Sequence, residues 1–202
     1  EDPPFKGRPQ RVVHPDGTET HYAYEESRDA AGAITDEIRK VWRGVPSGDG
    51  TSIIDGTYSY SHVDSKGQTL NAYSQDILSG ITTQSQQATA FDDFDRVTEV
   101  TYLDGRTTSR GYGCCGVQWE TDRLGITTSY TYDAIKRVET MTRQGIITTY
   151  YYDKLGRQDR VTQTGTDGGV ITQSQMNYVD ASGMAYSSFD PLNRETSSTT
   201  VH

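Results

Sequence analysis

Residues 125–157 read GITTSYTYDAIKRVETMTRQGIITTYYYDKLGR, and the short pattern in this stretch returns about every 20 residues. Glycines spaced by 20 mark the pattern: Gly105, Gly125, Gly145 and Gly165. Three residues after the first three of these glycines stand threonines, and seven residues after them stand tyrosines, namely Thr108, Thr128 and Thr148, and Tyr112, Tyr132 and Tyr152. Self-similarity at a fixed period predicts a repeat architecture.

The composition indicates an all-β protein with thin layers. Only 32% of the residues are apolar, which argues against a thick core, whereas 14 Tyr, 20 Gly and many Thr favour pleated, half-buried strands over disorder. We expect an antiparallel β-hairpin repeat strip, open or part of a shell or solenoid. We expect a single domain over residues 1–202 with a flexible loop near residues 44–56, where Gly, Pro, Ser and Asp gather.

The charge pattern excludes some classes of partner. The formal net charge is -9, and no Lys/Arg block longer than a dipeptide offsets it, so a nucleic-acid partner is not expected. No apolar run of 18 or more residues and no signal-peptide pattern occurs, so membrane insertion is not expected either. Because the sequence begins at Glu1 without Met, a processed product or a piece of a larger protein is the expectation.

The first half contains the same unit with insertions. Asp16-Gly17 lies between two β-prone runs, and Asp-Gly is a strong hairpin signal because Gly tolerates positive φ. The spacing of Ile34, Ile38 and Val41 suits a helical face as well as a strand. We favour a strand there, because Asp-x-x-Gly recurs as a turn along the chain.

Apolar residues at one fixed offset predict the buried side of the later strands. Val100, Met141 and Val161 each stand nine residues after an aromatic that opens a turn, and Glu99, Glu139 and Arg160 are out of phase with them. Side chains alternate between the two faces of a strand. The sequence therefore predicts that the first three lie on the buried face.

The turns that follow Tyr132 and Tyr152 carry a specific chemistry. In each turn, Asp133 or Asp153 can accept hydrogen bonds from backbone N–H groups two or three residues on. The fifth position, counted from the tyrosine, needs a left-handed conformation. Gly156 suits that position well and Lys136 suits it poorly. The tyrosines are predicted to stack on their equivalents in neighbouring repeats, with each hydroxyl reaching a polar partner. The repeat-turn residues are Tyr132, Asp133, Arg137, Tyr152, Asp153, Gly156 and Arg157.

The segment Tyr152-Asp153-Lys154-Leu155-Gly156-Arg157, with Gly145, Thr148 and a pitch near 20, resembles the YD repeat of the RHS family. The likeness is tight from Phe91 to Thr166 and looser outside it. Relatives include bacterial RHS toxins, insecticidal toxin-complex subunits and teneurins. The resemblance implies a strip of β-hairpins that spirals into a hollow shell, with neighbouring repeats as partners and a secreted or cell-surface location. About eight turns fit in 202 residues, so part of a shell or an open sheet is expected.

Cys114-Cys115 is the deviation within the repeat. The pair fills the variable positions of a turn in which Gly113 stands in the aspartate's place, Gly116 in the glycine's and Val117 in the arginine's. Three interpretations stand open: a vicinal disulfide ring, two reduced thiols that fill space, and a metal or redox site. A ring beside Tyr112 and Trp119 would offer a flat face for a sugar. The candidate ligand-binding residues are therefore Tyr112, Cys114, Cys115 and Trp119.

The remaining polar clusters carry weaker hypotheses. Asp92, Asp93 and Asp95 lack the spacing of a known calcium loop, so an ordinary acidic surface turn is preferred, and no metal or other cofactor is predicted. His14 and His21 flank the Asp16-Gly17 turn, and a facing pair with Tyr22 would suit acid-base chemistry of a polysaccharide-cleaving enzyme.

The resemblance to RHS shells, which often end in an Asp-Pro segment where the chain cuts itself, makes Phe189-Asp190-Pro191-Leu192 a candidate for such a segment. We interpret it as one more repeat turn, because Asn193-Arg194 follows without a glycine-rich continuation. The function predicted first is a non-enzymatic structural and interaction module, serving as shell, stalk or filament wall, with homo-assembly as one route. The second is a carbohydrate-binding module that takes polysaccharide, and the third is the enzyme.

Overall fold

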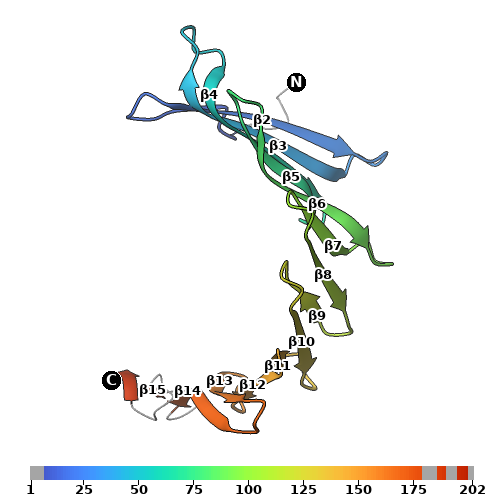
Figure 1. The fold of residues 1–202 in the computed structure, drawn as a ribbon, viewed down its shortest axis with the longest axis vertical. Helices are drawn as coiled ribbons and strands as arrows, with labels where there is room; N and C mark the ends of the chain where they lie inside the picture. The colour runs from blue at the N-terminus through green and yellow to red at the C-terminus, as the bar shows by residue number, and fades with distance from the viewer. Residues whose placement is uncertain (1–6, 179–185, 190–194, 200–202) are drawn as a thin grey trace. The chain divides into compact units, whose positions relative to one another are not determined.

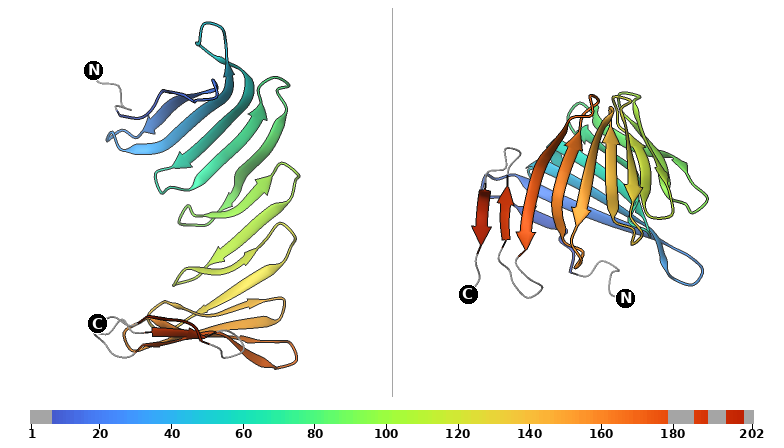
Figure 2. Two further views of the ribbon diagram at one scale, coloured as in Figure 1. Left: turned by 90° about the vertical axis from the view of Figure 1, so that its left-hand side faces the viewer. Right: turned by 90° about the horizontal axis from the view of Figure 1, so that it is seen from below.

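A computed structural model describes residues 7–178, 186–189 and 195–199. The turn predicted around Asp180-Ala181-Ser182-Gly183 and the segment Asp190-Pro191-Leu192-Asn193-Arg194 lie outside these residues. The described part is all-β, as predicted, with consecutive strands paired antiparallel and no helix, hence no helix that could cross a membrane (Figures 1 and 2). The chain divides into two compact units, residues 1–108 and 109–202, and the single domain stays a prediction.

The first unit contains long strands in chain order. They are β1 (Arg11–Val13), β2 (Glu19–Arg28), β3 (Ile34–Pro46), β4 (Ile53–Asp64), β5 (Thr69–Asp76), β6 (Thr82–Phe91) and β7 (Val97–Tyr102). β8 (Thr107–Tyr112) spans the division between the units. The Asp16-Gly17 hairpin is confirmed, since Gly17 has φ 83 and His14 N–H donates to Thr18 O at 2.9 Å. The strand preferred over a helix at Ile34–Val41 is also confirmed, as part of β3.

The connection between β3 and β4 is shorter than the predicted loop near residues 44–56. It covers residues 47–52, and Ser47 N–H donates to Ser52 O at 2.8 Å across its base. Gly44 and Gly56 lie inside the two strands and face each other in register. A methyl group on Gly56 would lie 2.1 Å from Arg43 O, so the close approach of these backbones requires glycine.

The second unit contains shorter strands, again in chain order. They are β9 (Val117–Thr121), β10 (Thr127–Tyr132), β11 (Val138–Arg143), β12 (Ile146–Tyr152), β13 (Gln158–Thr164), β14 (Val170–Tyr178), β15 (Tyr186–Phe189) and β16 (Glu195–Thr199). Each pairs antiparallel with the next strand in the chain. Figure 2 shows these strands side by side in a single layer.

The 20-residue spacing of the tyrosines results from turns of two lengths. In the five-residue turn, the first N–H donates to the fifth carbonyl, as Asp133 N–H does to Arg137 O at 2.9 Å. In the four-residue turn, the first N–H donates to the fourth carbonyl, as Gly113 N–H does to Gly116 O at 2.9 Å. The connection from Arg143 to Ile146 is also of four residues, because these two residues pair directly.

Segments of five and six residues alternate between these turns from Phe91 to Tyr152, so only the lengths of the turns vary the spacing of the aromatics. Phe91 and Tyr112 are 21 residues apart because both intervening turns have five residues. Tyr112, Tyr132 and Tyr152 follow at 20, since each interval contains one turn of each length. Gly165 breaks the series: it begins a five-residue turn, and the left-handed residue of that turn is Gly168, with φ 81.

Threonines occupy the most buried positions of the repeat. Thr20, Thr128, Thr148 and Thr162 are 3–7% exposed, and Ile53 and Val97 are the buried apolar residues among those described. Val100, Met141 and Val161, predicted on a buried face, are only half-buried. A single layer of strands has no second layer to cover large side chains, so the small β-branched threonine fills the interior positions instead.

A row of five threonines crosses five consecutive strands of the second unit. Each pairs in register with the next, in the order Thr131, Thr140, Thr149, Thr162 and Thr172. The hydroxyls of Thr131 and Thr140 lie 2.7 Å apart. Cross-strand pairs of this kind stabilise a sheet by roughly 0.2–1 kcal/mol each.

Candidate functional site

The Asp133–Arg137 and Asp153–Arg157 turns are built alike. In the first, Asp133 Oδ1 accepts from Ile135 N–H and Arg137 N–H at 3.0 and 2.9 Å, and Arg137 Nε donates to Asp133 Oδ2 at 2.7 Å. The predicted carboxylate cap is thus present, but the second backbone N–H donor is four residues after the aspartate, not three. These donors hold the pKa of Asp133 below its usual value, most strongly through the Arg137 N–H. Asp153 makes the same bonds to Leu155 and Arg157.

The left-handed position of these turns is the fourth residue after the aromatic, as the sequence predicts. Gly156 has φ 83 and Lys136 has φ 67, so the poorly suited lysine adopts the conformation all the same. Asp95, the fourth residue after Phe91, is also left-handed, with φ 55. It lies in a turn that Asp92 caps in the same way as Asp133 caps its own turn. Because Asp92 binds Arg96 and two backbone N–H groups, its carboxylate is committed to the turn.

An arginine, rather than a second tyrosine, contacts the ring of Tyr152. The Arg137 guanidinium carbon lies 4.0 Å from the centroid of the Tyr152 ring. Tyr152 Oη donates to Val138 O at 2.8 Å, so ring and hydroxyl both bind the preceding turn. The tyrosine ladder predicted for this repeat is therefore replaced here by a cation–π contact between repeats. Burial raises the pKa of Tyr152.

The Cys114–Cys115 turn differs from the others in length as well as composition. Its closing bond makes Gly116, not Val117, the equivalent of Arg137. Val117 corresponds to Val138, because Tyr132 Oη donates to Val117 O at 2.6 Å in the way that Tyr152 donates to Val138 O. The alignment made from sequence was therefore wrong by one residue at this turn. Both cysteines are free, and their Sγ atoms lie 2.6 Å apart.

The four residues of the predicted ligand site lie at the end of β8, in the turn that follows it and in β9. Trp119 pairs with Gly111, and a methyl group on Gly111 would lie 2.3 Å from the indole Nε1, so the ring covers this glycine. The pairing of β8 with β9 shifts register between Gly111 and Tyr112, where Tyr112 pairs with Val117. Trp119 is 39% exposed, whereas the cysteines form the tip of the turn. A ligand site at Tyr112, Cys114, Cys115 and Trp119 therefore stays a prediction.

His14 and His21 do not face each other. His14 Nε2 lies 2.8 Å from Thr20 Oγ1, whereas His21 Nε2 lies 2.8 Å from Glu19 Oε2, and Thr20 and Glu19 are on opposite faces of β2. Tyr22 shares the face of Thr20 and lies under the Arg39 guanidinium at 5.4 Å. The acid-base constellation predicted from the sequence is not assembled.

Glu19 is a buried carboxylate with strong donors. Arg11 donates to both of its oxygens, at 2.7 and 2.5 Å, and Glu19 is 6% exposed. The hydrogen bond from Arg11, followed by that of His21, lowers the pKa of Glu19 to about 2. Because each donor is matched to this carboxylate, the group is a structural ion pair at the end of β2.

An aromatic cluster across β3, β4 and β5 was missed in the sequence. Trp42 and Tyr58 have ring centroids 5.1 Å apart, Tyr58 and Tyr73 5.9 Å apart, and Tyr60 and Tyr73 5.0 Å apart. Burial, then the bond with Tyr73, raises the pKa of Tyr58 to about 12. The alternate spacing of Tyr58 and Tyr60 signals that they share a face, whereas the partners from other strands depend on register.

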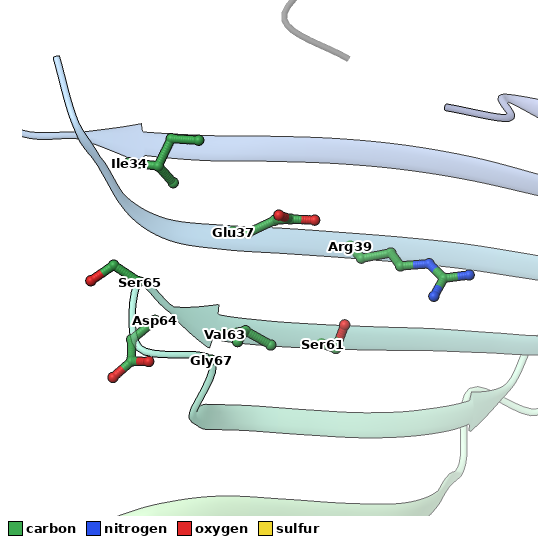
Figure 3. Close-up of a pocket in the computed structure, with 8 residues that line it drawn as sticks. All are labelled: Ile34, Glu37, Arg39, Ser61, Val63, Asp64, Ser65 and Gly67. Atoms are coloured by element: carbon green, nitrogen blue, oxygen red, sulfur yellow. The ribbon is translucent and has the colours of Figure 1, made fainter. Parts of the chain in front are cut away.

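One open hollow of about 530 Å³ lies between β3, β4 and the turn that follows β4. Figure 3 shows the residues around it, which are Ile34, Glu37, Arg39, Ser61, Val63, Asp64, Ser65 and Gly67. Its carboxylates are already engaged, because Glu37 accepts from Arg8 while Asp64 accepts from Lys66 N–H and Gln68 N–H. No group of three or more His, Cys, Asp or Glu in the described part of the chain converges to hold a metal ion.

Comparison with known proteins identifies the fold. No protein-family model and no curated protein matches the sequence. Crystal structures of TcdB2-TccC3-TEV and TcdB2-TccC3 are similar, with TM-scores of 0.52 and 0.53, 16% identity in both, and coverage of 97% and 90% of this chain. TcdB2-TccC3 without its hypervariable C-terminal region has a TM-score of 0.50 at 14% identity over 97% of the chain.

The chain spans 11% of the length of each of these structures. At such identities the likeness shows the fold alone. The RHS family itself stays a prediction from the sequence. The all-β hairpin strip predicted from the sequence is therefore confirmed as a class of fold.

Proposed function

We propose that this chain is a non-enzymatic structural module: a YD-repeat-type strip of hairpins that forms the wall of a shell, stalk or filament in a secreted or cell-surface protein. The observation that carries the proposal is the contact between successive turns. Arg137 binds Asp133 in its own repeat and the ring of Tyr152 in the next, so each repeat is held by its neighbour. A single hairpin is marginal in water, and such nearest-neighbour contacts are what allow a one-layer repeat to persist.

The shared fold of the TcdB2-TccC3 structures supports this role, and neighbouring repeats of the same or another chain are the partners proposed. Electron microscopy of the purified chain at micromolar concentration tests it. Ordered particles or filaments are the expected result. A chain that stays monomeric and is cleaved by protease throughout residues 127–164 would contradict the proposal.

The Arg137 contact has a local readout in hydrogen exchange. Arg137→Ala is expected to accelerate amide exchange in β12 and β13 because Tyr152 loses its partner from the preceding repeat. Lys154→Ala is the matched control, since Lys154 is an exposed residue of the equivalent turn. Equal exchange in the two variants would show that the Arg137–Tyr152 contact does not couple the repeats, and would contradict the structural role.

Carbohydrate binding is the second candidate, favoured by Trp119. Its ring lies over Gly111, is 39% exposed, and is flanked on the same face by Ser129, which pairs with it across β9 and β10. An exposed indole beside hydroxyls suits a neutral polysaccharide. A glycan-array signal lost in Trp119→Ala, and kept in Tyr151→Ala, would support this function, because Tyr151 is also exposed but lies under Arg160. A signal that survives Trp119→Ala rules out this ring as the site.

A further inference from the structure

The Cys114–Cys115 turn has lost the groups that close the other turns of its repeat. Gly113 supplies no carboxylate to cap backbone N–H groups, and the turn has one residue fewer than the Asp133 turn. It is held by the bond from Gly113 N–H to Gly116 O and by the next repeat, through Tyr132 Oη on Val117 O. The two cysteines are therefore the tip of a tight turn with a fixed base.

The base of the turn brings the two thiols together. The Sγ atoms are 2.6 Å apart, and Cys114 is exposed whereas Cys115 is half-buried, so Cys114 is the more accessible of two thiols in direct contact. Contact with Cys114 and partial burial raise the pKa of Cys115, and Lys136 of the next repeat acts in the opposite direction.

We propose that Cys114 and Cys115 form a thiol–disulfide exchange site that reacts with low-molecular-weight disulfides and closes into a vicinal disulfide. This site goes beyond the proposed structural role, because the contacts of Arg137 with Asp133 and Tyr152 that carry that role do not involve the two thiols.

The exchange proceeds in two balanced steps. The Cys114 thiolate attacks one sulfur of a disulfide RSSR, forming a protein–SR mixed disulfide and releasing one RS⁻, which takes up a proton. Cys115 then loses its proton, and its sulfur attacks Cys114 Sγ, forming the Cys114–Cys115 bond and releasing the second RS⁻. The protein dithiol is oxidised by two electrons, and the small disulfide is reduced to two thiols. The adjacency of the sulfurs makes the second step intramolecular.

Glutathione disulfide is the probe, applied to the chain in its native fold, with intact mass and thiol titration as readouts. The expected result is the loss of both titratable thiols, a mass lower by two hydrogens, no retained glutathione and a monomer on a non-reducing gel. Persistent glutathione adducts on the wild-type chain, covalent dimers, or two thiols that remain titratable under these conditions would each overturn the proposal.

Single-cysteine variants provide the control. Cys114→Ser and Cys115→Ser each retain one thiol without a resolving partner, and each is expected to end as a stable glutathione adduct on the remaining cysteine. Phenylarsine oxide, which binds paired thiols, is expected to protect the reduced wild type from oxidation and to leave both variants unprotected. If either variant releases glutathione as fast as the wild type, a neighbouring thiol is not the resolving group. Circular dichroism confirms that the variants remain folded.

Discussion

The sheet around β2–β5 and the sheet around β10–β13 are both single layers, yet they are stabilised differently. β3 and β4 have 13 and 12 residues, and their faces carry an aromatic cluster that packs across three strands. β10 to β13 have six or seven residues; a row of threonines crosses them, and Asp, Arg and Tyr at the turns connect one repeat to the next. Long strands offer a face large enough for rings to cover one another, whereas short strands rely on threonines and on the contacts at their ends.

The largest expected effect tests the close backbone approach in the long-strand region. Gly56→Ala places a methyl group 2.1 Å from Arg43 O, so β3 and β4 must separate, at a cost of about 3 kcal/mol in the free energy of unfolding. Denaturant unfolding followed by tryptophan fluorescence measures the change through Trp42. Gly48→Ala is the control, because a methyl group there meets no atom within 4 Å. A loss confined to β10–β13 would contradict the division between the regions.

A smaller effect is expected when the aromatic cluster is cut. Tyr73→Ala removes the ring that contacts both Tyr58 and Tyr60, and the half-buried position predicts a loss of about 2 kcal/mol. Hydrogen exchange by mass spectrometry is expected to show faster exchange in β3–β5 and unchanged exchange in β10–β13. If Tyr73→Ala leaves β3–β5 as protected as before, the cluster is not what stabilises the long strands.

In the short-strand region, the hydroxyl of Tyr152 is expected to contribute to the free energy of unfolding. Tyr152→Phe removes the bond to Val138 O while keeping the ring under Arg137, with a predicted loss of about 1 kcal/mol. The same exchange measurement detects it, now in β11–β13. Tyr151→Phe serves as control, since Tyr151 points to the opposite face. Equal effects of the two substitutions would show that the inter-repeat bond contributes nothing.

Acid is expected to have the mildest effect. The pKa of Glu19 in the folded chain is about 2, below the unfolded value of about 4.3, so its contribution is present above the unfolded value and is lost as the pH falls toward 2. Asp92, Asp133 and Asp153 also have lowered pKa values and act in the same direction. Glu19→Gln is expected to flatten the decline in stability between about pH 4 and 2 relative to the wild type. A steeper decline would assign the acid sensitivity elsewhere.

Local signals in the sequence predicted the hairpins and the chemistry of their turns. Asp16-Gly17 and the Asp-x-x-Gly-Arg turns depend on interactions within five residues, and the positive φ of Lys136 follows from the turn that contains it. The length of the Cys114–Cys115 turn escaped prediction, because Gly116 stands at the position expected for the glycine of the repeat and is also the residue that closes the turn. A single residue changes the register there, and the second turn of the repeat compensates for it.

Contacts between strands were the least predictable part of the candidate sites. His14 and His21 bind Thr20 and Glu19, which alternate between the two faces of β2, and these partners were not anticipated. Trp119 covers Gly111 because β8 and β9 pair in one register, and that register is not visible in the residues themselves. The sequence therefore did not reveal which side chains meet across strands.

By itself, the sequence determined a β-hairpin repeat with a pitch near 20, because turn chemistry and strand propensity act over a few neighbouring residues. Only the tertiary structure decided that threonines fill the buried positions, that Arg137 rather than another tyrosine meets Tyr152, and that the two cysteines stand alone at a shortened tip. These features depend on register between strands, and a shift of one residue exchanges the faces of every side chain.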